Sequence, residues 1–165
     1  MKKKIVLFVS LIFVLVGCAI SNTPTSKVED LFNKYQMVDD DISLGIDNAI
    51  EEQNLSDDHK TRYRKLLENQ YKNLSYEIKD ELIDGDNATV LVEIEVIDYK
   101  RAIGDLTFDS TIYTKESYDE EKLNRLEKAN DKIKYTLEIK LSKDNDEWKI
   151  DALTNDQIKK IQGMF

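Results

Sequence analysis

The chain has 165 residues, with 24 lysines and arginines against 33 aspartates and glutamates, so its formal net charge is −9. Hydrophobic residues make up 41% and charged residues 35%, which allows a buried core and excludes a compositionally disordered chain. With one cysteine and five glycines, a protein held together by internal disulfides and a collagen-like protein are also excluded. This length predicts one domain of modest size.

The first residues have the pattern of a bacterial signal peptide. Three lysines follow Met1 and precede an apolar run from Ile5 to Val16, which only Ser10 interrupts. The run is twelve residues long, whereas a membrane-spanning helix takes about 20. A permanent transmembrane span is therefore the weaker interpretation.

The run ends at Leu15, Val16, Gly17 and Cys18, and this sequence resembles the lipobox of bacterial lipoproteins. The resemblance implies that residues 1–17 are removed and that Cys18 becomes the first mature residue, carrying a diacylglyceryl thioether. Each buried CH₂ group contributes roughly 0.8 kcal/mol, so two or three acyl chains give stable anchoring. The alternative is a soluble secreted protein with an incidental free cysteine.

Removal of the signal peptide changes the charge, because three lysines are lost and 21 cations then face 33 anions, a net charge of −12. Such a surface repels nucleic acid and anionic lipid headgroups, so we expect no nucleic-acid partner and contact with the membrane through the lipid on Cys18. Residues 18–25 are predicted to be the lipidated cysteine and a short polar tether. A composition rich in Lys, Asn, Ile and Asp is similar to that of low-GC Gram-positive bacteria, which places the domain on the extracytoplasmic face of the cell membrane.

Two helices are predicted at the start of the mature domain. Ser26 and Glu29 have capping-box spacing, which indicates a helix start, and residues 39–41, three aspartates, are expected on or beside its solvated side. Its apolar stripe recurs every three or four residues: Val28, Leu31, Tyr35, Val38, Ile42, Ile46, Ala49 and Ile50. A second helix is predicted to begin at Ser56 or Asp57. Its inner face is expected to hold Tyr63, Leu66, Leu67 and Tyr71.

Two hairpins follow, because the apolar period changes to two from Tyr76 onward. Residues 84–87, Asp-Gly-Asp-Asn, favour the first turn, and residues 143–146 favour the second. The apolar side of the first hairpin is Tyr76, Ile78, Leu82, Ala88, Val90, Val92, Ile94 and Val96. That of the second is Ile133, Tyr135, Leu137, Ile139, Leu141, Trp148 and Ile150.

Residues 100–131, between the hairpins, are too many for a plain loop in a compact domain. Ser117 and Glu120 have capping-box spacing, and the apolar residues that follow predict a helix in the second half. The first half is ambiguous between a helical face and a β-branched stretch, and we favour helix. A short final helix is predicted after Thr154 and Gln157, and Gly163 ends it.

The order of these elements, with the turn sequence of residues 84–87 and the ending of residues 141–150, resembles small Gram-positive lipoproteins that carry a domain of unknown function. That family has a cystatin-like, nuclear-transport-factor-like α+β fold. The resemblance covers residues 26–165 and implies a single α+β domain, with N-terminal helices packed on a curved antiparallel sheet made of two hairpins. It implies no catalytic residues.

Few residues suit catalysis or metal binding. His59 is the only imidazole, and its neighbours Ser56, Asp57 and Asp58 cannot act as nucleophile, base and orienting acid from one helical turn, so we expect a solvated histidine. Lipidation of Cys18 removes thiol chemistry. The acidic clusters at residues 39–41, 84–86 and 144–146 lack the glycine and glutamate positions of a calcium-binding loop, so we expect no metal and no cofactor.

One carboxylate is a formal candidate for acid catalysis, because cystatin-like folds include isomerases with an acid in an apolar cavity. By alternation, Asp80 is predicted to point to the same side as Tyr76, Ile78 and Leu82, although an acid near a strand end commonly reaches solvent. The sequence therefore favours a non-enzymatic, lipid-anchored binding or interaction module. The alternatives are a pocket enzyme of the isomerase or dehydratase type and a structural or self-protection protein of the envelope.

Overall fold

The computed structural model describes residues 22–165. The predicted signal peptide, the lipobox and Cys18 lie outside the described residues. The elements in chain order are α1 (Pro24–Met37), α2 (Asp40–Glu51), α3 (Asp57–Lys72), β1 (Ser75–Asp84), β2 (Asn87–Ile97), α4 (Tyr99–Ala102), α5 (Lys115–Lys128), β3 (Lys132–Asp144), β4 (Glu147–Ile150) and α6 (Asn155–Ile161).

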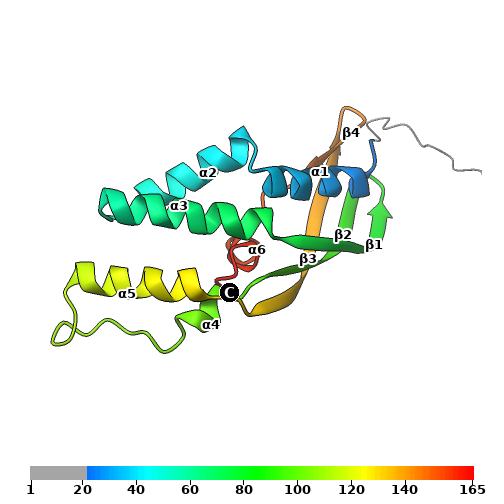
Figure 1. Cartoon of the computed structure of the whole chain (residues 1–165). Coiled ribbons are helices and arrows are strands. Elements are labelled where there is room, and N and C mark those ends of the chain that lie inside the picture. The colour runs from blue at the N-terminus through cyan, green and yellow to red at the C-terminus, as the bar shows by residue number, and fades with distance from the viewer. Residues whose placement is uncertain (1–21) are drawn as a thin grey trace, which may run out of the picture.

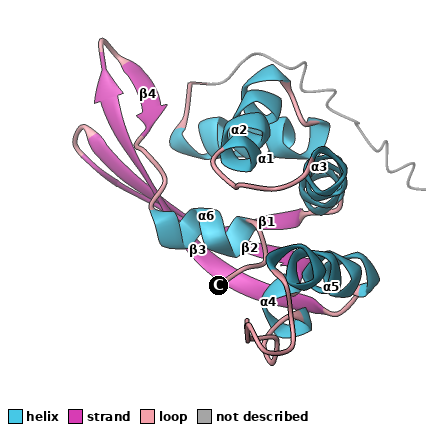
Figure 2. Ribbon diagram, turned by 90° about the vertical axis from the view of Figure 1, so that its left-hand side faces the viewer, coloured by secondary structure: helices cyan, strands magenta, loops and turns pink. Residues whose placement is uncertain are grey.

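The strands form one antiparallel sheet in the order β1-β2-β3-β4. Figure 1 shows the sheet at one end of the molecule, with α2, α3 and α5 extending away from it. Figure 2, which looks along these helices, shows α3 and α5 side by side in front of the twisted sheet. The predicted α+β class, with helices packed against two antiparallel hairpins, is confirmed.

The main core lies between the sheet and the N-terminal helices. Val90, Val92 and Ile94 of β2 have no exposed surface and pack in one cluster with Val28 and Phe32 of α1. Trp148 is buried in the same cluster, as predicted. The opposite face of the sheet is polar, and charged side chains of neighbouring strands pair across it, as cross-strand partners do in a sheet with one wet face.

The prediction of a single helix from Ser26 is wrong, because the helix is interrupted at residues 38 and 39, between α1 and α2. Val38 adopts a left-handed conformation with φ 50°, and the Asp39 carboxylate accepts a hydrogen bond of 3.0 Å from the Ile42 amide. Asp39 is thus the N-cap of a new helix, and the next two aspartates lie at the positive end of its dipole. The Asp39 carboxylate thus takes the place of the backbone carbonyl to which the Ile42 amide would donate in a continuous helix.

Two of the predicted helix starts are displaced by one turn. Thr23, not Ser26, is the N-cap of α1, and Thr114, not Ser117, is the N-cap of α5; in each capping box the serine is the third helical residue. The displacement has a physical reason in α1, since Pro24 suits the first helical position, where no amide partner is needed. The predicted starts of α3 after Ser56 and of α6 after Thr154 are confirmed.

A register shift in β1 reverses part of the predicted alternation. Pairing with β2 shifts between Ile78 and Asp80, so Asp80 lies opposite Leu91 on the wet face of the sheet. Leu82 lies opposite Thr89 and is 68% exposed. The prediction that Asp80 and Leu82 share the side of Tyr76 and Ile78 is therefore wrong, because one extra residue changes the parity of every later side chain.

Residues 100–114 contain less helix than predicted. Only α4, four residues long, is helical, and residues 103–114 form a loop. The Asp109 carboxylate accepts bonds of 2.8 Å from the Thr111 amide and 2.7 Å from its hydroxyl, and such a local turn competes with a helix for the backbone. The predicted helix in the second half is confirmed as α5.

A fully buried side chain, Gln70 of α3, joins the helices to the sheet. Its amide nitrogen donates to the Ile97 carbonyl at 3.0 Å, and its amide oxygen accepts from the Ile97 amide at 3.1 Å. Because β1 begins with Ser75 opposite Glu95, it offers no partner to Ile97, and the Gln70 side chain satisfies the edge of β2 there. Gly163, with φ 69°, lies against this pair, where a β-carbon would collide with the Ile97 carbonyl and the Gln70 side chain.

Candidate functional site

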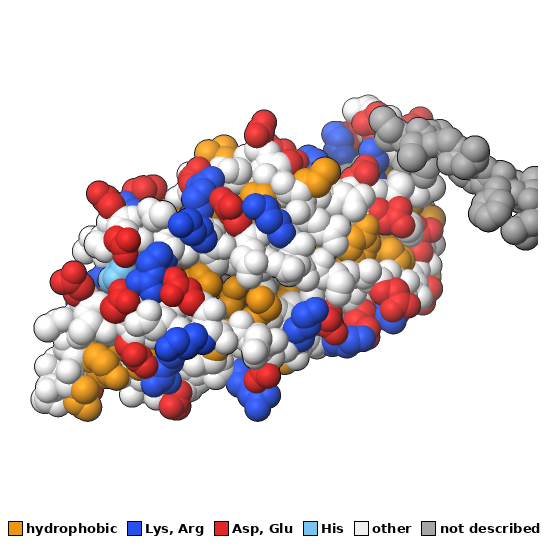
Figure 3. Space-filling model, in the orientation of Figure 1, with side chains coloured by type: hydrophobic (Ala, Val, Ile, Leu, Met, Phe, Trp, Pro, Cys, Tyr) orange, Lys and Arg blue, Asp and Glu red, His pale blue; other side chains and the backbone are white. Residues whose placement is uncertain are grey.

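The single histidine takes part in a polar network between α3 and α5. His59 is 5% exposed, so the predicted solvated histidine is wrong. Its Nε2 atom lies 3.0 Å from Oε2 of Glu120, a residue of α5 that is 61 positions away in the sequence. Figure 3 shows the visible edge of the histidine among acidic and basic side chains at the helical end of the molecule.

Arg62 is the centre of this network. Its Nη1 donates to the same Glu120 oxygen at 2.7 Å, and its Nε and Nη2 donate to the two oxygens of Glu127 at 2.8 and 2.9 Å. Nη2 also donates to Oδ1 of Asn124 at 2.9 Å. Fork-shaped pairing of this kind fixes orientation as well as contributing energy, so the network holds α5 at a set position along α3.

The electrostatics of the network favour ionised carboxylates. Hydrogen bonds from His59 and then Arg62 hold the pKa of Glu120 below its ordinary value of 4.5, and a hydrogen bond from Arg62 lowers the pKa of Glu127 in the same way. His59 has no serine, threonine or cysteine among the partners that the structure gives its ring. This arrangement suits a structural ion-pair network better than nucleophilic catalysis.

Acidification is expected to weaken the contact between α3 and α5. The pKa values of Glu120 and Glu127 are depressed in the folded state, so their stabilisation is present above pH 4.5 and is lost as the pH falls through the lowered values. Urea unfolding between pH 6 and pH 3 measures this loss. In Glu127→Gln the loss of stability with falling pH should be smaller than in the wild type.

The matched control is Glu138→Gln, because Glu138 is an exposed carboxylate in the middle of β3, away from any helix start, and has no ion pair among residues 22–165. It should follow the wild-type pH profile. An unchanged profile in Glu127→Gln would contradict the role given to the network.

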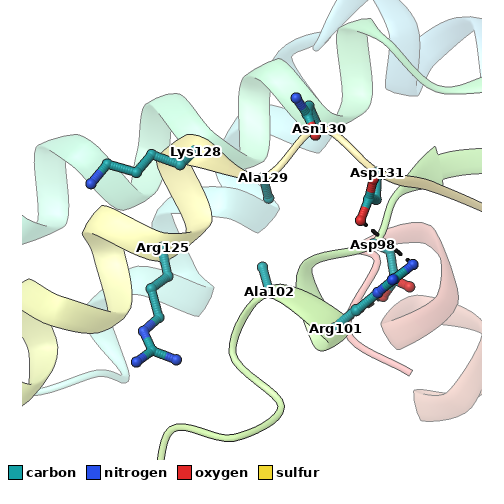
Figure 4. A pocket seen from close by; sticks show the side chains of 8 residues that line it. All are labelled: Asp98, Arg101, Ala102, Arg125, Lys128, Ala129, Asn130 and Asp131. Atoms are coloured by element: carbon teal, nitrogen blue, oxygen red, sulfur yellow. Dashed lines mark hydrogen bonds and ion pairs between the residues drawn. The ribbon is translucent and has the colours of Figure 1, made fainter.

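A groove of about 430 Å³ lies beside this network, between α4, α5 and the start of β3. Figure 4 shows Ala102 and Ala129 facing each other across it, with Arg101 and Asp131 on one side and Arg125 and Lys128 of α5 on the other. Arg101 lies 3.5 Å from Asp131. Arg125 is held by Glu121 at 2.7 Å and by an aspartate of the loop.

The groove is open to solvent, and its two arginines are not available to a ligand without competition, because each already pairs with a carboxylate. Two small alanines and six polar or charged residues line it, without large aliphatic or aromatic side chains, and none of the lining residues is a serine, cysteine or histidine. It can accept a polar side chain or a segment of a partner, but it offers no nucleophile with a base beside it.

The other predicted candidates are scattered. Asp80 is exposed and lines a groove of about 470 Å³ on the wet face of the sheet, opposite the face that packs on the core. The acidic turns at residues 84–86 and 144–146 lie next to each other, because the Lys143 amide donates to the Asp86 carbonyl at 2.8 Å. Within residues 22–165 there is no group of three or more histidine, cysteine, aspartate or glutamate side chains placed to hold a metal ion.

Glu120, Arg62 and Glu127 were not predicted from the sequence as a site. A signal for them exists: His59 and Arg62 are three residues apart, and Glu120, Asn124 and Glu127 recur every three or four residues. Such spacing places each set on one helix face. It does not show that the two faces meet, since that depends on how α5 returns across the molecule to α3.

Comparison of the chain with known protein families, with curated proteins and with solved structures finds no match. Among residues 22–165, no helix has the length and apolar character needed to cross a lipid bilayer.

Proposed function

We propose that this protein is a bacterial lipoprotein, anchored through Cys18 to the extracytoplasmic face of the cell membrane, and that its α+β domain is a non-enzymatic binding or interaction module. The lipobox residues Leu15, Val16, Gly17 and Cys18, after a short apolar run, carry the first part of the proposal. Residues 1–17 are the signal peptide, and residues 26–165 form the domain that the lipid holds at the membrane.

The chemistry of the candidate groups supports a binding role. His59 is engaged by Glu120 in a network that joins two helices, and Asp80 is exposed on the wet face of the sheet instead of lying in an apolar cavity. The acids of pocket isomerases act from apolar cavities, whereas the Asp80 side chain is exposed to solvent. A surface that recognises a partner requires neither group.

The test is to express the full chain in a Gram-positive host and in a deletion strain, and to compare it with Cys18→Ala. Mass spectrometry of the membrane fraction should show Cys18 as the mature N-terminus with a diacylglyceryl group. Cys18→Ala should leave the membrane fraction and lose in-cell function, because anchoring sets the local concentration at the membrane surface.

Asp80→Asn is the matched control, since it removes the candidate catalytic carboxylate while leaving the anchor intact. It should complement the deletion as well as the wild type at equal protein levels. An unmodified Cys18 or an intact Met1 terminus would contradict the anchoring, and loss of function in a stable Asp80→Asn protein would contradict the non-enzymatic role.

A further inference from the structure

The described chain begins at a fixed point on the sheet. The side-chain oxygen of Asn22 accepts a hydrogen bond of 3.0 Å from the Trp148 amide, and its side-chain nitrogen donates to the Asp146 carbonyl at 2.6 Å. Asp146 lies in the turn between β3 and β4, and Trp148 is the second residue of β4. The polypeptide therefore leaves the domain beside that turn.

The entry into α1 is fixed at the same end of the sheet. The register shift in β1 turns Glu81 toward α1, where its carboxylate accepts bonds of 2.8 Å from the Thr25 amide and 2.7 Å from the Thr25 hydroxyl. Asn22 and Thr25 thus tie both sides of the helix start to strands, one to β4 and one to β1. These contacts fix where Asn22, the first described residue, lies on the domain.

Both hairpin turns lie at this end, together with two exposed apolar side chains. Asn87 pairs with Ser142, so the two turns are level, and the Lys143 amide joins them. Just before the first turn, Leu82 is 68% exposed and Ile83 is 51% exposed. We call this surface, made of residues 82–87 and 143–147, the turn end.

Cys18 lies four positions before Asn22, with three residues between them, and at roughly 3.5 Å per step this stretch of chain reaches at most about 14 Å. We infer that the turn end is the surface of the domain that faces the lipid bilayer, with Leu82 and Ile83 at the headgroup level. This orientation rests on the proposed lipidation of Cys18. The short tether, and not charge, brings this surface to the membrane, because its acidic turns repel anionic headgroups and limit deeper insertion. The two aliphatic side chains can lose water at the headgroup level.

The opposite end of the molecule then points away from the membrane. Helix α3 has 16 residues and is about 24 Å long. Figure 1 shows it running from the sheet to the far end, where α5 begins and the loop before it lies. Phe108 and Ile112 of this loop are 53% and 71% exposed. The orientation leaves the loop and the neighbouring groove accessible to molecules that approach from outside the cell.

The experiment uses the lipidated full-length product in phosphatidylcholine vesicles that contain a small fraction of lipid with a nitroxide on its headgroup. The natural chain has one cysteine, and the thioether consumes its thiol, so an introduced cysteine is the only free one. Ile83→Cys and Ile112→Cys are labelled with the same small fluorophore. Both positions are exposed, and circular dichroism checks that each variant is folded.

Quenching by the headgroup nitroxide, which acts only at close range, should be at least threefold stronger at position 83 than at position 112. Equal quenching at the two positions, stronger quenching at position 112, or no quenching at either in vesicle-bound protein would overturn the orientation. Mass spectrometry of the same sample separates the two proposals. A lipidated Cys18 with the wrong quenching pattern contradicts the orientation alone, whereas an unmodified Cys18 contradicts the proposed function and the orientation with it.

Discussion

Replacing Trp148 with alanine should lower the free energy of unfolding by about 3 to 5 kcal/mol. The indole is 7% exposed and belongs to the main core, on a strand only four residues long. Truncation removes the largest side chain that holds β4 against α1, and the cavity cannot be filled without moving one of them. Since Trp148 is the only tryptophan, urea unfolding is followed by circular dichroism and not by fluorescence.

Phe108→Ala is the matched control, because it also removes an aromatic ring but from an exposed loop position, where Tyr118 is its one aromatic contact within residues 22–165. Its cost should be no more than about 1 kcal/mol. A loss below about 1 kcal/mol in Trp148→Ala would show that β4 does not depend on the core.

Replacing Gln70 with methionine should cost about 2 to 6 kcal/mol, although methionine has nearly the same length. The change leaves the amide and the carbonyl of Ile97 without the partners that Gln70 supplies, and each unsatisfied buried group costs about 1 to 3 kcal/mol. Amide hydrogen exchange should show the Ile97 amide losing protection more than the centre of β2, and urea unfolding measures the total loss.

Gln53→Met provides the comparison, since Gln53 follows α2 and its side chain donates one bond of 3.3 Å to the Ala49 carbonyl near the end of that helix. Its effect should stay within about 0.5 kcal/mol. If the two glutamine variants were equally stable, water would be replacing the Gln70 amide, and the side chain would not act as a substitute for a neighbouring strand.

The predicted hairpins and most helices are confirmed because their signals are local. Residues 84–87 and 143–146 contain the types that tolerate the left-handed conformations found at Gly85, Asn145 and Asp146. Helix α3 has its capping serine and its acidic first turn within four residues. Where several local signals agree on one secondary structure, contacts with the rest of the chain rarely change it.

The wrong predictions arise where two local signals compete, or where contacts between residues far apart in the sequence determine the structure. Thr23 and Ser26 can both cap a helix, and Pro24 favours the earlier start. The helical stripe through Val38 is continuous in the sequence, but Asp39 caps a separate helix. For Asp80, the alternation of β1 holds only up to Ile78, and the shift in pairing with β2 then reverses it.

By itself, the sequence determined the α+β class, the two hairpins, the position of α3 and the buried side of Trp148, because capping, turn chemistry and apolar period act over a few residues. The tertiary structure decided the burial of His59 against Glu120, the role of Gln70 at the end of β2 and the attachment of Asn22 to the β3–β4 turn. These contacts join residues 61, 27 and 126 positions apart. Only the packing of α3, α5 and the sheet brings such partners together, since a polar side chain takes whichever partner the surrounding fold leaves within hydrogen-bond distance.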